Sequence, residues 1–227
     1  MLFEDMSWMD VERHLERDDR VVVVTGACEQ HGYLSLLADI RIPLAVAREA
    51  CKRERVLIAP PLPYGISPYF TAYPGTLSLR PETFAAVVGE VIEGLLAQGF
   101  RRVLVSNGHG GNTGLVSPLL VELGNAHPEA RISLFHWWRH PAVDAVAQEA
   151  GLPQYHANWS ENFPFTRVGP VPEGEKEPVQ VPGTAAAGFR AALGDGSFGG
   201  PYQAPDAVME RLFAAAVEAM VEALREM

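Results

Sequence analysis

The chain has 227 residues, 48% of them hydrophobic and 20% charged, which fits one globular domain whose core needs no disulfides. Its formal net charge of −10, without any run of Lys or Arg, excludes the clustered positive charge that phosphate binding needs, so we expect no nucleic-acid partner. The two cysteines, Cys28 and Cys51, match no zinc-binding or disulfide spacing.

The first residues, 1–10, are mixed acidic and aromatic, without the basic start and apolar stretch of a signal peptide. The longest apolar runs are too short to span a bilayer. We therefore expect a protein of the reducing cytoplasm with no membrane partner.

The first half of the chain alternates between strand-like and helix-like segments. Residues 20–25 are β-branched and apolar on both faces, which predicts a buried parallel strand. We expect a helix over 42–53 and a second strand over 55–59. A loop rich in Pro, Gly and aromatic residues follows over 62–79. The next predicted helix begins at about Pro81, because Pro is favoured in a first helical turn, and ends near Gln98.

The second half continues the alternation. We expect a third strand over 102–106, a helix over 113–125, a fourth strand over 131–135 and a helix over 141–150. The final predicted helix, about 204–226, carries a clear apolar stripe that can pack on the sheet.

Two segments near the C-terminus carry few such signals. Residues 155–182 contain several prolines and resemble an active-site flap or an oligomer contact, since long irregular stretches in compact domains are usually functional or disordered. Their aromatic residues, among them Trp159 and Phe163, favour order. Residues 188–205 are rich in Gly.

The alternation predicts one α/β domain over residues 1–227, with three α/β/α layers and a mostly parallel central sheet. Binding sites in such folds lie at the carboxyl ends of the strands. The first predicted strand leads to Glu29, and the third leads to the segment Asn107-Gly108-His109-Gly110-Gly111-Asn112.

Three side chains near the first strand could bind a divalent metal. Glu29 and His31 lie at positions i and i+2, so on an extended segment they point the same way, and carboxylate with imidazole suits such an ion. The alternative is a salt-bridged Glu beside a surface His. Asp39 could bridge two ions with its two oxygens, or cap a helix that starts near Pro43.

His109 gives the strongest single signal, because a His held among glycines is poorly explained by packing, and glycines let a backbone approach a ligand closely. The turn lacks the Lys-Ser/Thr pair of a phosphate-binding loop. Asn107 and Asn112 can hold it through hydrogen bonds to the backbone.

The irregular segment offers two more candidates. Glu161 could complete the shell of a second metal, and His156 could act as general acid or base near neutral pH. Both could also be incidental polar residues of a flap. Cys28 could be a nucleophile beside His31, although a Cys after four valines is more often a small buried hydrophobe.

At these residues the chain resembles the creatininase (creatinine amidohydrolase) family. The matching stretches run in family order and cover most of the chain: Gly26 to Gly32 with Asp39, Tyr73 to Leu79, Asn107 to Asn112, and His156 to Glu161. The resemblance implies a site with two ions of zinc, manganese or iron, hydrolysis of a C–N amide-type bond in a small molecule, and homo-oligomers that are often hexamers.

By position, the resemblance implies that Glu29, His31, Asp39 and His109 are metal ligands, with Asp39 bridging. Glu161 is then a further ligand or a partner of the bound water, and His156 the catalytic histidine. We expect substrate contacts from four further residues. These are Trp138, Trp159, Tyr73 and Asn112.

The chain also departs from the family pattern. Tyr33-Leu34-Ser35 stands where Pro-His-Leu-Pro is common, and Phe70 where many members have a histidine. Gly111 replaces a Glu of creatininase itself, with Glu161 as the expected substitute ligand, and Asn158-Trp159 replaces Gly-Glu. We expect these changes to line the pocket and to argue against creatinine as the substrate.

Two hypotheses of different class follow. The first is a metal-dependent amidohydrolase, in which His156 protonates the leaving nitrogen. The second is a non-catalytic protein on the same fold that binds a metal or a small molecule, and the altered pocket residues motivate it.

Overall fold

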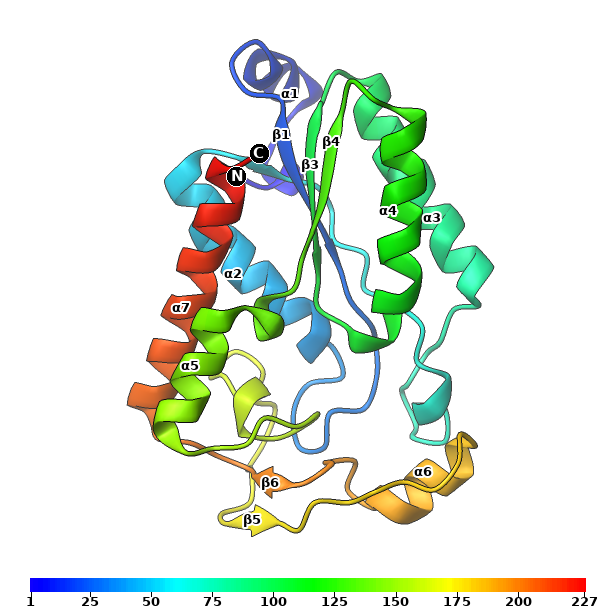
Figure 1. The fold of residues 1–227 in the computed structure, drawn as a ribbon, viewed down its shortest axis with the longest axis vertical. Helices are drawn as coiled ribbons and strands as arrows, with labels where there is room; N and C mark the ends of the chain where they lie inside the picture. The colour runs from blue at the N-terminus through cyan, green and yellow to red at the C-terminus, as the bar shows by residue number, and fades with distance from the viewer.

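A four-stranded parallel sheet forms the centre of the molecule (Figure 1). The computed structural model describes all 227 residues, and its strands lie in the order β2-β1-β3-β4. Their bounds are Arg20–Thr25 for β1, Leu57–Ile58 for β2, Arg102–Asn107 for β3 and Arg131–Phe135 for β4. The prediction of a parallel α/β sheet is confirmed, with β2 shorter than expected.

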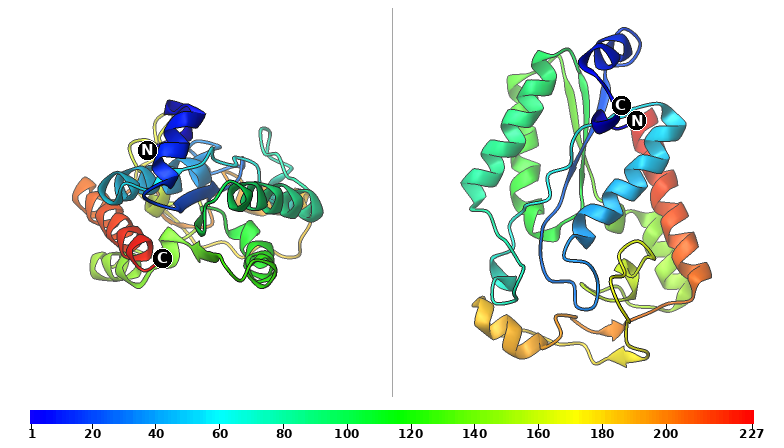
Figure 2. Two further views of the ribbon diagram at one scale, coloured as in Figure 1. Left: turned by 90° about the horizontal axis from the view of Figure 1, so that it is seen from above. Right: turned by 180° about the vertical axis from the view of Figure 1, so that it is seen from behind.

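Helices cover both faces of this sheet (Figures 1 and 2). One layer contains α2 (Ala38–Glu54), α5 (Pro141–Ala150) and α7 (Asp206–Arg225), and the other contains α3 (Pro81–Ala97) and α4 (Thr113–Ala126). The predicted three-layer α/β/α architecture is therefore confirmed.

The alternation of side chains along β1 explains why both faces are buried. Val22 and Val24 belong to a core cluster shared with α2, α5 and α7, whereas Val21 and Val23 belong to a second cluster shared with α3 and α4. Successive residues of a strand point to opposite faces. A run of four valines can therefore fill two cores at once.

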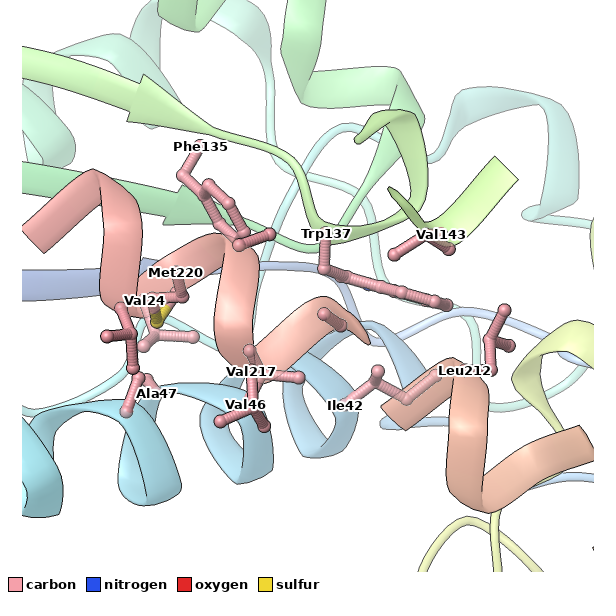
Figure 3. Packing of buried hydrophobic residues seen from close by; sticks show 14 of the residues in the cluster. Val24, Ile42, Val46, Ala47, Phe135, Trp137, Val143, Leu212, Val217 and Met220 are labelled. Atoms are coloured by element: carbon pink, nitrogen blue, oxygen red, sulfur yellow. The ribbon is translucent and has the colours of Figure 1, made fainter. Parts of the chain in front are cut away.

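The larger cluster lies between the sheet, α2 and α7. Figure 3 shows Val46 of α2 beside Val217 of α7, with Trp137 lying between the segment after β4 and the helices. This core holds α2 against the sheet, and α2 carries Asp39 in its first turn.

The start of α2 corrects one prediction. The helix begins at Ala38 with Leu37 as its N-cap, so Asp39 is not the cap of a helix that starts near Pro43. Pro43 lies inside the helix and has no N–H to donate to the carbonyl of Asp39 four residues earlier. That carbonyl instead packs against the backbones of Gly26 and Gly108.

Several helices and strands of the structure were not predicted from the sequence. They are α1 (Trp8–Leu15), α6 (Ala186–Leu193), the antiparallel pair β5 (Glu175–Lys176) and β6 (Gly200–Pro201), and the short 3-10 helices Phe3–Asp5, Pro68–Phe70, Gly110–Asn112, Trp137–Arg139 and Trp159–Glu161. The signal for α1 was present, because Ser7 and Asp10 form a capping box. The helix α6 was not predicted, because Gly188 lies inside it and the surrounding segment is rich in Gly.

The segment that contains α6, β5 and β6 lies across the end of the sheet where the parallel strands finish (Figure 1). The side chain of Lys176 holds part of this segment together, donating to the carbonyls of Leu193 and Ser197 and to the carboxylate of Asp195. No helix in the structure combines the length and the apolar character needed to cross a membrane.

The buried contact between α2 and α7 predicts a clear difference between two valine truncations. Val217 of α7 is 1% exposed, whereas Val121 of α4 is 65% exposed. Val217→Ala should lower the free energy of unfolding by about 2 kcal/mol more than Val121→Ala, because only the first loses buried apolar contacts. Both changes alter helix propensity equally, so urea denaturation of the pair isolates the packing contribution. Equal stabilities would contradict this view of the core.

Candidate metal centre

Five side chains of the types that can bind a metal ion meet beyond the carboxyl ends of β1 and β3. They are Glu29, His31, Asp39, His109 and Glu161, and His156 lies beside them. Each of three subsets offers ligand atoms that all lie within 4.8 Å of one another: Glu29 with Asp39 and His109, His31 with Asp39 and Glu161, and Glu29 with His31 and His156. The fold thus brings together residues from four separate stretches of the chain.

Asp39 stands between two histidines and faces each with a different oxygen. Its Oδ1 lies 3.0 Å from Nε2 of His31, and its Oδ2 lies 2.8 Å from Nδ1 of His109. A carboxylate in this position can offer one oxygen to each of two ions.

Backbone carbonyls orient both histidines. Nδ1 of His31 lies 3.1 Å from the carbonyl oxygen of Glu29, and Nε2 of His109 lies 2.9 Å from the carbonyl oxygen of Ile66. A carbonyl oxygen only accepts hydrogen bonds, so the ring nitrogen that faces it carries a proton. The other ring nitrogen then points toward the carboxylates. Metal-binding histidines commonly have such a second partner.

The two glutamates are held differently. Oε1 of Glu29 lies 3.5 Å from Nδ1 of His109 and 3.7 Å from Nδ1 of His156. Oε2 of Glu161 accepts a hydrogen bond of 2.7 Å from the backbone N–H of Ala157, while its Oε1 lies 3.8 Å from Nε2 of His31. One oxygen of Glu161 is thus anchored and the other faces the centre.

Burial and mutual attraction shift the pKa values of the cluster strongly. Burial raises the pKa of Glu29 to about 7. Burial alone would lower the pKa of His109, but the carboxylates of Asp39 and Glu29 outweigh it and raise that pKa to about 9. Burial opposes the shift of Asp39 as well, yet His31 and His109 hold its pKa well below the usual range. Among the protein groups alone, protons on the histidines balance the carboxylates.

The residues present fit a divalent metal. Oε2 of Glu29 is buried and has no hydrogen-bond partner, and an unsatisfied buried polar group costs about 1–3 kcal/mol. Oxygen and imidazole donors suit zinc, manganese or iron. A cation would replace the protons and give the buried carboxylate of Glu29 a partner.

His156 lies at the boundary between this cluster and a cavity of about 340 Å³. Phe70 stacks on its ring at 4.9 Å with an angle of 9°, and Phe198 meets it edge-on at 5.6 Å. Burial and the nearby His31 lower its pKa to about 3. The ring is therefore held neutral between two aromatic walls.

The cavity includes only part of the predicted substrate-contact set. Trp138 lines it. Trp159 is fully buried in the core, and its indole N–H donates to the carbonyl of Pro153. Asn112 is fully buried too. Its side-chain amide donates to the carbonyl of Gly26 and accepts from the backbone N–H of Ile66. Tyr73 lies outside the lining and contacts Phe70 at 6.4 Å between ring centroids.

The departures from the family pattern divide in the same way. Phe70 and Gly111 line the cavity, whereas Asn158 and Trp159 are buried away from it, so the expectation that all of these changes line the pocket was wrong. A Cβ on Gly111 would lie 2.3 Å from the carbonyl oxygen of Ile66 and 2.4 Å from Nε2 of His109. This backbone therefore excludes a side chain at position 111.

Some cavity residues carried no signal in the sequence. Phe198 comes from the Gly-rich segment, and Gln154, Tyr155 and Ser160 precede or follow His156 in the irregular one. Cys28 does not fit the nucleophile hypothesis, since burial and the adjacent Glu29 raise the pKa of its thiol and a thiolate is the reactive form.

The sequence of the chain is similar to those of known hydrolases. The sequence matches the creatininase family, described as creatinine amidohydrolase, over residues 4–224. The creatinine amidohydrolase of Pseudomonas putida is 31% identical over 112 residues, which are 46% of this chain and 43% of that protein. The 3-dehydro-scyllo-inosose hydrolase of Thermotoga maritima is 28% identical over 48% of this chain and 35% of that protein. Less than half of the length of these two relatives is matched.

A third relative is matched over more of its length. The mycofactocin precursor peptide peptidase of Mycobacterium tuberculosis is 28% identical over 218 residues, which are 87% of this chain and 81% of that protein. The relatives thus include hydrolases with different named substrates.

Solved structures share the whole fold. A crystal structure of creatinine amidohydrolase superposes with a TM-score of 0.82 at 23% identity, covering 99% of this chain and 96% of that one. A manganese form of creatininase gives a TM-score of 0.82 at 24% identity, covering 99% and 97%. At this level of identity the likeness establishes the fold alone.

Two glycines of the same turn should respond differently to alanine. A Cβ on Gly108 would lie 1.9 Å from the carbonyl oxygen of Asp39, whereas a Cβ on Gly110 would meet nothing within 4 Å. Gly108→Ala should therefore push α2 away from the strand end and cost about 1–3 kcal/mol of unfolding free energy. Gly110→Ala, the matched control, should change stability little. Thermal unfolding of both variants tests this, and equal losses would show that the contact with Asp39 is unimportant.

Proposed function

The chain belongs to the creatininase family, and on that premise we propose that it is a metal-dependent amidohydrolase that cleaves a C–N amide-type bond. The observation that carries this proposal is the position of Asp39, whose two oxygens face His31 and His109 separately. Around it stand two further carboxylates, and a cavity opens directly beside them.

We infer two divalent ions per chain, of zinc, manganese or iron. Glu29, Asp39 and His109 would hold the first, and His31, Asp39 and Glu161 would hold the second. When bound, such ions lower the pKa of water toward neutrality and polarise a carbonyl oxygen. Solved creatininases include a manganese form and a zinc–zinc form, which supports these metals without deciding among them.

His156 is the residue placed to move a proton. Hydrolysis adds water across the C–N bond, so carbon gains an oxygen and the leaving nitrogen gains a proton. Nδ1 of His156 faces Glu29 at 3.7 Å and the residue lines the cavity, so the neutral ring would take a proton from the attacking water and pass it to the leaving nitrogen. General acid catalysis by histidine contributes typically about 10²–10⁴-fold to rate.

The cavity favours a flat and uncharged or cationic amide. Its walls include the aromatic side chains of Phe70, Trp138, Tyr155 and Phe198, and no Lys or Arg lines it. An anionic group on the substrate would therefore have no side-chain cation to pair with. Cyclic amides, formamides and creatinine-like compounds meet this description, and we propose them as the substrate class.

A peptide amide is the second candidate class. The relative matched over 87% of this chain is named a peptide peptidase, so a restriction to non-peptide bonds is not part of the proposal. The homo-oligomer, a hexamer by resemblance, stays a prediction. A non-catalytic binding protein is the alternative function, motivated by Phe70 and Gly111 in the cavity wall.

The shared position of Asp39 predicts unequal losses of metal. The purified protein should bind two ions per chain, and Asp39→Ala should bind none because both donor sets lose a ligand. His31→Ala and His109→Ala should each keep at most one ion. Elemental analysis gives the ratio, circular dichroism checks folding, and Glu129→Ala, which removes an exposed carboxylate, is the control. Full occupancy in Asp39→Ala would refute the bridging assignment.

A substrate panel separates the enzyme from the binding protein. We expect the metal-loaded protein to hydrolyse at least one member of a panel of lactams, formamides, creatinine and short peptides, with activity abolished by a chelator. His156→Gln should lower the rate by about 10²-fold or more. His127→Gln, at a partly exposed position well separated in the chain from His156, should leave the rate unchanged. Metal binding without turnover of any member would favour the non-catalytic alternative.

A further inference from the structure

One ammonium group lies at the centre of the loop formed by residues 193–199. It belongs to Lys176 of β5, whose side chain is 19% exposed. Its Nζ donates to the carbonyl oxygens of Leu193 and Ser197 and to Oδ1 of Asp195. An ammonium has three N–H groups to donate, so this loop takes up all of them. We call residues 193–199 the Lys176 loop.

The remaining bonds of the Lys176 loop start from Asp195. Its Oδ1 also accepts from the backbone N–H of Ser197 at 3.1 Å, and its Oδ2 accepts from the hydroxyl of Tyr202 at 2.7 Å. The hydroxyl of Ser197 accepts in turn from the N–H of Gly199 at 3.2 Å. Side chains therefore supply most of the bonds within this loop, and Lys176 supplies three of them.

Phe198 is the residue that the Lys176 loop presents to the cavity. Its ring lines the cavity, and its N–H donates to the carbonyl of His156 at 3.2 Å. Its neighbours on both sides, Ser197 and Gly199, are bonded within the loop. The position of the Phe198 ring therefore follows from the fold of the loop.

Phe189 of α6 joins this ring to the opposite side of the cavity mouth. Its ring centroid lies 5.8 Å from that of Phe70 and 6.4 Å from that of Phe198, and Phe70 and Phe198 lie 6.2 Å apart. We call these three rings the aromatic wall. They belong to segments that lie across the end of the sheet (Figure 1).

The aromatic wall borders a small space. The cavity has a volume of about 340 Å³, near the lower end of the roughly 300–1,000 Å³ that ligand sites usually have. Phe70 and Phe198 both line it. A substrate whose chain continues past the amide on this side would meet the wall.

We propose that Lys176 is a positioning residue that sets the size of the substrate: it holds the loop that keeps Phe198 in the aromatic wall, so that the cavity admits a small amide and excludes a peptide. Without Lys176, two carbonyls and one carboxylate of the loop lose their shared donor, and the wall loses its support. The inference rests on the proposed function and decides between its two substrate classes.

The cobalt-loaded protein allows a test without turnover, because a hydroxamate that binds the metal changes the visible spectrum of cobalt. Acetohydroxamate is the small probe and trialanine hydroxamate the peptide-sized one. We expect the unmodified protein to bind acetohydroxamate at least about tenfold more tightly. Lys176→Met keeps the length of the side chain and removes its donors. It should bind trialanine hydroxamate about tenfold more tightly than the unmodified protein does, with the affinity for acetohydroxamate unchanged.

Two further variants separate the wall from general stability. Phe198→Ala should favour trialanine hydroxamate in the same way, and it replaces Lys176→Met if that variant does not fold. Tyr202→Phe is the matched control, because it removes one hydrogen bond to Asp195 and none from Lys176. It should leave the ratio of the two affinities unchanged. A general loss of stability would weaken both probes together and would not move this ratio.

Amide hydrogen exchange in the metal-free protein tests the placement of the loop separately. The N–H groups of residues 197–199 have the acceptors described above, and in Lys176→Met they should exchange about tenfold faster, the ratio for one hydrogen bond of typical net strength. Tyr202→Phe should change their exchange by less than about twofold.

Unchanged exchange in Lys176→Met, an affinity ratio that is the same in all variants, or tight binding of trialanine hydroxamate to the unmodified protein would each overturn the inference. A protein that binds no cobalt would instead refute the proposed function, and the claim about substrate size with it. The two failures are therefore distinguishable.

Discussion

The close approach of the first turn of α2 to the ends of β1 and β3 is the constraint on which the site depends. The carbonyl of Asp39 packs against Gly26 and Gly108 so tightly that neither position has room for a Cβ. Pro43 permits this approach, because it removes the N–H that would otherwise bond that carbonyl within the helix. The larger core cluster, between the sheet, α2 and α7, holds the helix in this position. Backbone packing, rather than the ligands themselves, thus sets where the carboxylate of Asp39 lies.

Once Asp39 is placed, electrostatics determine what the cluster can do. Three carboxylates lie within a largely buried volume, and the only cationic partners in contact with them are histidines. Burial of charge is costly unless it is paired, and here the pairing raises the pKa of His109 to about 9 while Oε2 of Glu29 still has no hydrogen bond. Protons therefore compensate the charge incompletely. A divalent cation carries the charge of two protons. It would compensate the negative charge of the carboxylates through directional bonds to their oxygens.

Sequence reasoning could predict the strands and the ligand-type residues but not the walls of the cavity. The valine run of β1 and the glycines around His109 encode local geometry directly, so strand, turn and ligands follow from neighbouring residues. Trp159 and Phe198 have no such local code. Which of them faces the cavity depends on how residues 153–205 fold over the sheet end, and that is a matter of tertiary contacts such as Lys176 with Asp195. Trp159 and Asn112, for which we predicted substrate contacts, lie outside the cavity lining, and both side chains are engaged in internal hydrogen bonds.

The three histidines of the cluster differ in the partner of the ring nitrogen that faces away from the carboxylates. In His31 and His109 it meets a backbone carbonyl, which fixes one tautomer and suits a permanent ligand. In His156 it meets both a carbonyl and an amide of Gln30, which fixes neither. A ligand benefits from a single protonation state, whereas a residue that moves protons must pass between two. Under the proposed function, backbone carbonyls and the amide of Gln30 thus distinguish the two ligand histidines from the one that transfers a proton.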